Sequence, residues 1–313
     1  MILIIAEETD MHALAVARAL YEMKPSMQVT IVDAQEFPAR SMIEIGTNYW
    51  SMKTLDGRVV SSSEVSSIWW RRALAHDISK SVRDPTARSF SANESAHAFR
   101  SIAHWPSYRV VNNVERERIA SYKPLQHHIA CNIGLKMPET IVTNDPKSVL
   151  DFYKEHKNII YKVMTSPISM FAETRRFDES DLEALQSLTH APVIFQKEIT
   201  KTRDIRVTVV GKDVFTASVK GKLQRGKILP DWRLDATAEC TQIDLPPDIL
   251  SRILDLTGEL GLDYAAVDLI EDVGGEIFFL EVNPSGQFLF VEIDTGQPIS
   301  RSIAELLLRV GVS

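Results

Sequence analysis

The sequence has few cysteines, no long apolar run and no excess of positive charge. Its 313 residues include two cysteines, Cys131 and Cys240, which lack the spacing of metal ligands. We therefore expect a reduced, cytoplasmic setting and no metal bound through thiolates. No apolar stretch approaches the length of a membrane span, so we expect no membrane insertion. The net charge of −7 argues against general binding to nucleic acid or to anionic membranes.

A glycine-rich phosphate loop is also lacking at the start of the chain. Met1 to Ala6 is a short apolar strand, a helix is expected from about Asp10, and Gln28 to Val32 is a second strand. This order is typical of a Rossmann-like domain. The first turn, however, reads EETD, so it has no glycine and carries the wrong charge for a pyrophosphate. The sequence predicts a Rossmann-like shape without dinucleotide binding.

The chain is long enough for two or three compact units. Strand Ser67 to Arg72 ends in two cations, read as an exposed edge or a functional pair, and a helix follows at Phe90 to Phe99. Val110 to Asn113 closes the first unit, and the pattern then changes to a mixture of short strands and helices. We predict a mixed α/β and α+β chain with units at 1–114, 115–197 and 198–313. The later elements that we expect are helix Leu125–Ile133, strands Ile159–Val163, Ala191–Ile199, Asp204–Gly211 and Val214–Lys220, and a last helix at Asp248–Leu260.

Near the C-terminus, an apolar strand at 278–283 carries two oxygen-bearing side chains, Glu281 and Asn283. Because alternate strand residues point the same way, both share one face. Tyr264 to Ile270 is a second strand, joined to the first by a tight turn at 272–275. Folding the two together places Asp268 opposite or diagonal to Glu281. The hairpin is either amphipathic with a solvated face, or a site of hard oxygen ligands suited to Mg²⁺. Its apolar flanks favour the second interpretation, because a buried strand needs partners for such side chains.

These residues resemble a known family. Val267-Asp268-Leu269 followed by Leu280 to Pro284 resembles the metal-binding end of the ATP-grasp ligases, and the run at 280–292 (LEVNPSGQFLFVE) is most similar to the microviridin-type graspetide maturases. Those enzymes cross-link a ribosomally made peptide through side-chain esters or amides. The resemblance implies an ATP-grasp fold with an N-terminal Rossmann-like domain, ATP held between two α+β lobes, and Mg²⁺ bound by Asp268, Glu281 and Asn283.

The resemblance also gives roles to cations and to a hinge. Lys162, in the middle of an apolar strand, either extends to solvent at an edge or points into an anionic pocket; it matches the lysine that grips the α- and β-phosphates. Lys123, otherwise a surface cation before a helix, matches a second nucleotide lysine. The segment Gln196-Lys197-Glu198-Ile199 matches the hinge, where backbone groups pair with adenine and Glu198 takes the ribose hydroxyls. Residues 164–176 match a lid, although an ordinary loop is the default reading.

Arg206 alternates with Ile205 and Val207, so it faces away from their core and toward the transferring phosphoryl group. Asp204 either orients Arg206 or contacts the nucleotide. Asp231 and Arg233 follow a basic stretch that is a solvated loop when read alone. In the graspetide branch an Asp-x-Arg motif at this place handles the acidic core peptide, so Arg233 is expected to bind the carboxylate to be activated.

The resemblance thus predicts an enzyme that converts Asp or Glu carboxylates of a precursor peptide into acyl phosphates and joins them to Ser or Thr hydroxyls or Lys amines. The peptide would carry an acidic core and a leader, which we expect near the hairpin at 207–219. The alternative is a ligase that joins an amino acid to a small molecule or a protein tail, as glutamate ligases do. The sequence leaves open ester or amide, ring size, the general base and whether the chain forms a homodimer.

Overall fold

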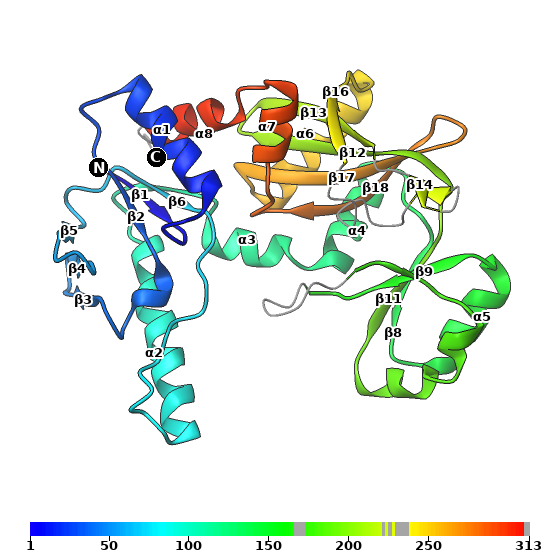
Figure 1. Cartoon of the computed structure of the whole chain (residues 1–313), viewed down its shortest axis with the longest axis horizontal. Helices are drawn as coiled ribbons and strands as arrows, with labels where there is room; N and C mark the ends of the chain where they lie inside the picture. Colours follow the sequence, from blue (N-terminus) through cyan, green and yellow to red (C-terminus); the bar gives the residue numbers. More distant parts are fainter. Residues whose placement is uncertain (166–172, 221–222, 225–226, 229–237, 310–313) are drawn as a thin grey trace.

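The structure, a computed structural model, describes residues 1–165, 173–220, 223–224, 227–228 and 238–309. Asp231, Arg233 and part of the expected lid lie outside these residues. A parallel sheet stands at the N-terminal side, a small antiparallel sheet lies in the middle of the chain, and a longer antiparallel sheet follows toward the C-terminus (Figure 1).

The N-terminal sheet is parallel throughout and has the order β2-β1-β6-β7. Its strands are β1 (Ile2–Ile5), β2 (Val29–Val32), β6 (Ser67–Trp70) and β7 (Arg109–Val111). Helix α1 (Met11–Met23) begins after Asp10, whose side chain accepts hydrogen bonds from the backbone of His12 and Ala13. The predicted β-α-β opening is therefore confirmed. Because β6 lies between β1 and β7, it is not the exposed edge that we had considered.

Helix α2 (Pro85–Ala103) is longer than the segment expected from the sequence. It begins earlier because Asp84 caps it by accepting from the Ala87 amide, while Pro85 occupies the first turn. A separate antiparallel sheet is formed by β3 (Met42–Ile45), β4 (Trp50–Lys53) and β5 (Val59–Ser61). A 3₁₀ turn, η1 (Ala34–Glu36), connects β2 to this region.

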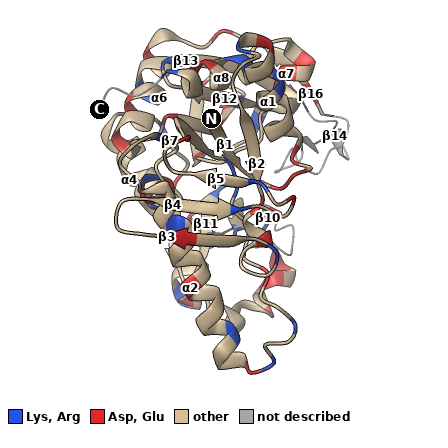
Figure 2. Ribbon diagram, turned by 90° about the vertical axis from the view of Figure 1, so that its left-hand side faces the viewer, with Lys and Arg blue, Asp and Glu red and all other residues tan. Residues whose placement is uncertain are grey.

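Acidic and basic residues are interspersed along the ribbon in the view of Figure 2. This distribution agrees with the absence of a strong positive charge in the sequence. Among the helices of the described residues, none is both long and apolar enough to cross a membrane.

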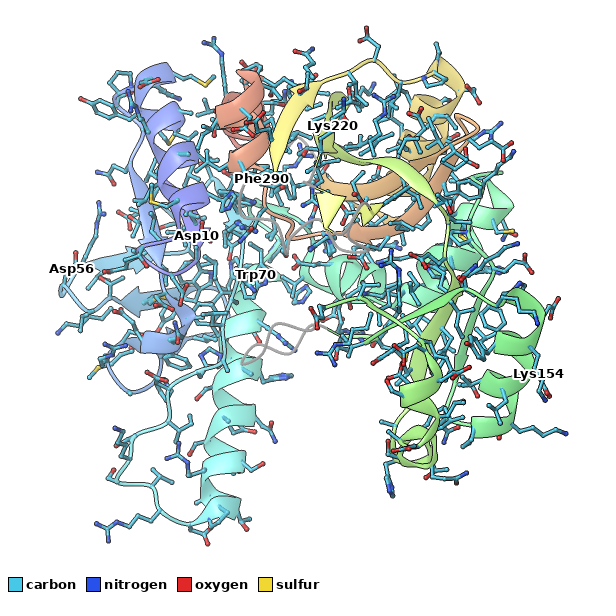
Figure 3. The ribbon with its side chains drawn as sticks, turned by 45° about the vertical axis from the view of Figure 1, so that its right-hand side comes forward. Asp10, Asp56, Trp70, Lys154, Lys220 and Phe290 are labelled. Carbon is cyan, nitrogen blue, oxygen red and sulfur yellow. The ribbon has the colours of Figure 1, made fainter. Side chains whose placement is uncertain are left out.

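The middle sheet has the order β10-β9-β11-β8 and is antiparallel. Its strands are β8 (Thr140–Thr143), β9 (Ile159–Lys162), β10 (Arg175–Arg176) and β11 (Val193–Lys197), with helix α5 (Pro146–His156) and the 3₁₀ turns η2 (Glu179–Leu182) and η3 (Leu185–His190). This lobe and α2 project on the same side of the molecule, as Figure 3 shows with Lys154 on α5. Two expectations change. Lys162 ends its strand instead of lying in its middle, and the last two residues of the expected lid, Arg175–Arg176, form a strand.

The C-terminal sheet has the order β16-β13-β12-β17-β18 and is antiparallel throughout. It contains β12 (Lys201–Val210), β13 (Asp213–Lys220), β16 (Glu239–Gln242), β17 (Tyr264–Asp272) and β18 (Ile277–Asn283). A small ladder, β14 (Leu223–Gln224) with β15 (Lys227–Ile228), lies between β13 and β16 in sequence. The expected boundary at 197/198 falls between β11 and β12, and the one at 114/115 falls inside α3 (Val114–Ala120).

One face of the C-terminal sheet is covered by α4 (Lys123–Asn132) and α6 (Pro247–Leu260), whose apolar residues join Ile205, Val207 and Val282 in one core cluster. The expectation that α6 is the last helix is wrong, because α7 (Leu289–Thr295) and α8 (Ile299–Leu308) follow it. The sequence analysis ended the last strand at a turn and overlooked the helical spacing of the apolar residues that follow Pro298.

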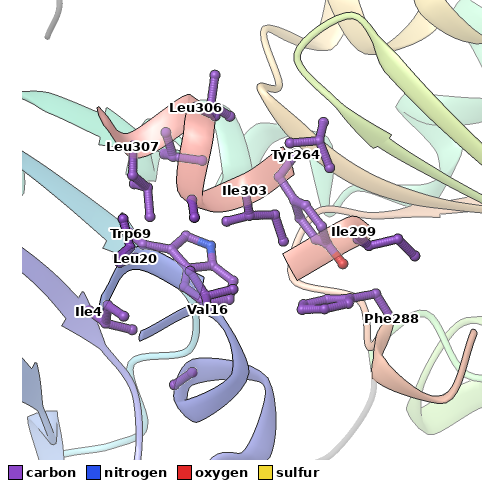
Figure 4. Close-up of a cluster of buried hydrophobic side chains, with 14 of the residues drawn as sticks. Ile4, Val16, Leu20, Trp69, Tyr264, Phe288, Ile299, Ile303, Leu306 and Leu307 are labelled. Carbon is purple, nitrogen blue, oxygen red and sulfur yellow. The ribbon is translucent and has the colours of Figure 1, made fainter. Parts of the chain in front are cut away.

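Helix α8 packs against the N-terminal part of the chain. Ile4, Val16, Leu20 and Trp69 share a buried cluster with residues of α8 and of the C-terminal sheet (Figure 4). Burial of so many apolar side chains in one shared cluster stabilises the contact between the two ends of the chain. The end of β6 is thereby held beside the turn that follows β18.

Candidate functional site

A row of charged side chains crosses three neighbouring strands of the C-terminal sheet. Arg206 of β12 lies opposite Asp268 of β17, and Asp268 lies opposite Glu281 of β18. The predicted pairing of Asp268 with Glu281 is therefore confirmed as directly opposite. Residues opposite one another share a face of the sheet, and Ile205 and Val207 of β12 face the apolar core on the other side.

Arg206 is held firmly in this row. Its Nη1 donates to Asp268 Oδ1 at 2.6 Å, and its Nη2 donates to the carbonyl of Gln287 at 2.8 Å. The residue is 5% exposed. Asp204 lies two residues away on the same face and pairs with Lys201 at 2.7 Å, whereas the carboxylate that holds Arg206 is that of Asp268.

A bulge lies next to Glu281, one of the metal-ligand candidates. The register between β17 and β18 shifts after Asp268, so Leu280 has no residue opposite it. Such bulges re-aim side chains and are frequent beside active sites. The Leu280 carbonyl, 3.1 Å from His127 Nε2, is bound from α4. Asn283, at the end of β18, is exposed and accepts the Ser285 amide at 3.1 Å.

Glycine is required at the turn after β18. A Cβ added at Gly286 would lie 2.3 Å from the Ala266 Cβ and 2.7 Å from Arg206 Nη2. The backbone of this turn therefore lies so close to Arg206 that only a residue without a side chain fits at position 286.

Helix α4 brings Lys123 to the metal-ligand candidates. Lys123 is the first residue of the helix, not part of the turn before it, and its Nζ is 2.8 Å from Glu281 Oε2. Gln126 fixes this position, because its amide donates to the Val282 carbonyl at 2.7 Å and accepts from the Val282 amide at 2.9 Å. Both bonds lie next to Glu281, so α4 and β18 are fastened together at the site.

His127 connects this group to the middle sheet. Burial lowers the pKa of His127; its bond to the Leu280 carbonyl and the charge of Glu281 raise it, and the charges of Lys162 and Lys123 lower it further. The two lysines and Glu281 are thus close enough to act on one imidazole. Lys162 is half-buried at the end of β9, and β9 lies between β10 and β11, not at the sheet edge.

The four hinge candidates, residues 196–199, differ in burial and in their side-chain partners. Gln196 is buried; its Nε2 donates to Thr140 Oγ1 at 2.8 Å, and its Oε1 has no hydrogen-bond partner within the described ranges. Glu198 is half-buried and pairs with Arg176 at 2.7 Å. Lys197 pairs with Glu139 at the surface, and Ile199 is half-buried between β11 and β12. These four residues follow one another along one segment, and the side-chain partners of its polar members are Thr140, Arg176 and Glu139.

The donor set at Asp268, Glu281 and Asn283 fits Mg²⁺. Two carboxylates and one amide oxygen come from adjacent strands, which is the ligand chemistry that this cation prefers. Arg206 and Lys123 add positive charge on either side, where phosphate oxygens would be bound.

Residues that the sequence analysis did not assign complete the surroundings. Asn112 donates to the carbonyls of Tyr264 and Pro284 and accepts the amides of Asp263 and Tyr264, so it ties the end of β7 to the site. Arg71 is 2% exposed and donates to the Ser285 carbonyl. In the sequence, each of these two residues is recognisable only as a polar residue directly after an apolar strand. Their partners could not be identified from the sequence, because they lie more than 150 positions away.

A cavity of about 680 Å³ opens next to Asn283. It is bounded by the segment after β6, by α2 and α3, and by the turn at 283–285. Trp70, on its wall, lies near the centre of the molecule in the view of Figure 3. Three arginines from the N-terminal half, Arg72, Arg100 and Arg118, also line it.

Comparison with known proteins gives a consistent result. The profile of a family described as a RimK-like ATP-grasp domain matches residues 120–307, more than half of the chain. No curated protein sequence matches. A crystal structure of the macrocyclase MdnC bound with its precursor peptide MdnA, from Microcystis aeruginosa, is 28% identical, with a TM-score of 0.88, and the match covers 98% of this chain and 99% of that one. A peptide-associated (RiPP-associated) ATP-grasp ligase of Chryseobacterium gregarium, in complex with ADP and a leader and core peptide, is 27% identical, with a TM-score of 0.85 and coverage of 98% and 96%. The predicted ATP-grasp fold is confirmed.

Proposed function

Because the chain belongs to the RimK-like ATP-grasp family, we propose that it is an ATP-dependent ligase acting on a ribosomally made precursor peptide. It activates side-chain carboxylates of Asp or Glu and joins them to Ser or Thr hydroxyls or to Lys amines, which closes macrolactone or macrolactam rings. The observation that carries the proposal is the row of Arg206, Asp268 and Glu281 with Lys123 beside it.

The first step is phosphoryl transfer from ATP to the substrate carboxylate. Arg206 is fixed by Asp268 and by the Gln287 carbonyl, so its guanidinium is already oriented to stabilise charge on the transferring group. Lys123 and Lys162 bind the remaining phosphate oxygens, and the hinge at 196–199 receives adenine and ribose. Asp268, Glu281 and Asn283 would hold Mg²⁺, which neutralises phosphate charge when bound.

In the second step a hydroxyl or an amine of the peptide attacks the acyl phosphate, and phosphate leaves. This chemistry needs no nucleophile from the protein, because the activated carboxylate is itself the acyl donor. The site must instead exclude water from the acyl phosphate. The cavity beside Asn283 offers a recess for this chemistry, because it is lined by elements from both halves of the chain.

The peptide substrate is supported by similarity along nearly the whole chain. The MdnC structure contains a precursor peptide, and the Chryseobacterium ligase contains a leader and a core peptide. We propose that an acidic core segment is bound by Arg233 with Asp231, and that a leader binds near the hairpin of β12 and β13. The division into units at 1–114, 115–197 and 198–313 remains part of the same proposal.

The test is incubation of the protein with ATP, Mg²⁺ and a precursor peptide encoded beside its gene. We expect ADP formation that depends on the peptide, and a mass loss of one water for each ring. Tandem mass spectrometry then distinguishes ester from amide. Peptide-dependent ADP formation with no dehydrated product would contradict macrocyclisation.

A second candidate is favoured by the family description itself, which is that of a RimK-like domain. In this alternative the chain joins an amino acid to a small molecule or to a protein tail. The product would then gain the mass of an amino acid residue, whereas ring closure loses water. The same mass spectrum therefore separates the two functions.

A further inference from the structure

A carboxylate that the proposed mechanism does not use lies beside the turn after β18. Glu117 of α3 accepts a hydrogen bond through Oε1 from the hydroxyl of Ser285. Its second oxygen, Oε2, is inaccessible to solvent and has no hydrogen-bond partner in the part of the chain that the structure describes. Both residues line the cavity next to Asn283.

Among the residues that the structure describes, Arg71 is a cation whose charge acts on Glu117. Arg71, which directly follows β6, donates a hydrogen bond to the Ser285 carbonyl. Its Nε is 3.6 Å from Asp10 Oδ2, so a second carboxylate partly neutralises its charge. His12, two residues after Asp10, has a pKa lowered to about 4, chiefly by burial and then by the charge of Arg71, while Asp10 acts in the opposite direction. On α3 itself, Glu115 pairs with Arg118. Burial raises the pKa of Glu117 to about 7, although Ser285 and Arg71 act in the opposite direction.

A purely structural role does not account for this arrangement. Tying α3 to the turn requires one acceptor for the Ser285 hydroxyl, and a neutral amide would serve without leaving a charged oxygen buried and unpaired. A buried carboxylate that exchanges a proton near neutral pH, and that reaches a reaction cavity through a hydroxyl, is instead suited to acid–base chemistry.

We propose that Glu117, acting through the Ser285 hydroxyl, takes up the proton of the attacking substrate group in the second step. This inference rests on the proposed function. The substrate oxygen or nitrogen forms a bond to the acyl carbon, the bond from that carbon to the phosphate oxygen breaks, and phosphate leaves with the electron pair. The substrate proton passes to Ser285 Oγ while the Ser285 proton passes to Glu117. The carboxylic acid formed then returns its proton to solvent or phosphate.

The two steps can be measured separately. Hydroxylamine captures the acyl phosphate as a hydroxamate, so ADP and hydroxamate report activation, and dehydrated peptide reports ring closure. We would compare wild type, Glu117→Gln, Ser285→Ala and Ser285→Thr with precursor, ATP and Mg²⁺ between about pH 5.5 and 9. Glu259→Gln, a change at an exposed position of α6, is the matched control.

In the wild type we expect the rate of ring closure to rise through about pH 7 and then level off. Glu117→Gln should close rings about a hundredfold more slowly and without this inflection, while ADP formation continues and hydroxamate increases. Ser285→Ala should behave in the same way, and Ser285→Thr, which keeps a hydroxyl, should recover most of the rate.

Two results would overturn the assignment. One is ring closure by Glu117→Gln at the rate and pH profile of the wild type. The other is an equal loss of ADP formation and ring closure in Glu117→Gln, since this would place the residue in activation or in folding. Failure of the proposed function is distinct, because the wild type itself would then show no ADP formation that depends on the peptide.

Discussion

Arg206 and Asp268 lie directly opposite one another on neighbouring strands, with Arg206 Nη1 at 2.6 Å from Asp268 Oδ1. Asp268 is also opposite Glu281, whose Oε2 is 2.8 Å from Lys123 Nζ. From β12 across to α4, two neighbouring carboxylates therefore lie between two cations. Each carboxylate thus has a cationic partner within the protein, and the group combines oxygen atoms of the kind that Mg²⁺ prefers with cationic donors.

Replacing Arg206 with lysine should reduce ADP formation about a hundredfold, because a lysine cannot keep the bonds to Asp268 and the Gln287 carbonyl while facing a phosphate. Peptide-dependent release of ADP measures the effect. Arg203→Lys, on the same strand and paired with Glu271, serves as the control and should stay within about threefold of wild type. An Arg206→Lys enzyme with normal turnover would show that Arg206 does not act on the phosphoryl group.

Glu281→Gln and Asn283→Ala should abolish or strongly reduce turnover while folding stays nearly intact, since they remove metal ligands and little packing. When Mg²⁺ is titrated into either variant, any remaining activity should reach half-saturation at a Mg²⁺ concentration at least about tenfold higher than in the wild type. Removal of Mg²⁺ with a chelator should stop the wild-type enzyme. Glu276→Gln, exposed and paired with Lys136, should have the Mg²⁺ dependence of wild type. If either ligand variant cross-links peptide at the wild-type rate, the metal assignment is wrong.

Gly286→Ala should destabilise the protein by about 1–3 kcal/mol, because the new methyl group would overlap Ala266 and the Arg206 guanidinium. Activity should fall as well, since Arg206 must move. Urea unfolding measures the first effect. Gly258→Ala in α6, where nothing lies within 4 Å of the new Cβ, should instead stabilise by about 1 kcal/mol. Equal stability of the two variants would contradict the close approach at Gly286.

Glu117→Gln should make the protein more stable above pH 7. The pKa of Glu117 is raised from an ordinary value near 4.5 to about 7, so between these pH values the folded state binds more protons than the unfolded state. The ionised carboxylate therefore destabilises the fold fully above pH 7, by up to about 3 kcal/mol, and not at all below about pH 4.5.

The gain from Glu117→Gln should accordingly shrink as the pH falls from 7 to 4.5, as measured by urea unfolding across this range. Glu115→Gln on the same helix is the control. Its carboxylate is partly exposed and paired with Arg118, so we expect changes of about 0.5 kcal/mol or less. A Glu117→Gln variant with no pH-dependent gain would show that the carboxylate is solvated in the folded protein.

The local elements followed from the sequence because their causes are local. The alternation of Glu281 and Asn283 in an apolar strand, with a turn before it, gave the hairpin and placed Asp268 opposite Glu281. Asp10 and the spacing of Ala13, Val16 and Leu20 gave helix α1. Helices α7 and α8 were missed, and Lys162 was placed in the middle of a strand that it ends, because element boundaries depend on tertiary packing.

By itself, the sequence determined which residue types alternate on each strand, and through them the side-chain groups available at the site: carboxylate and amide oxygens on β17 and β18 and a guanidinium on β12. The tertiary structure alone decided which distant residues meet. Lys123 reaches Glu281 because Gln126 fastens α4 to β18, and Glu117 and Arg71 reach Ser285 because α8 packs the two ends of the chain together. Periodicity fixes the direction of a side chain within its own element, whereas burial of apolar surface between elements fixes its neighbours.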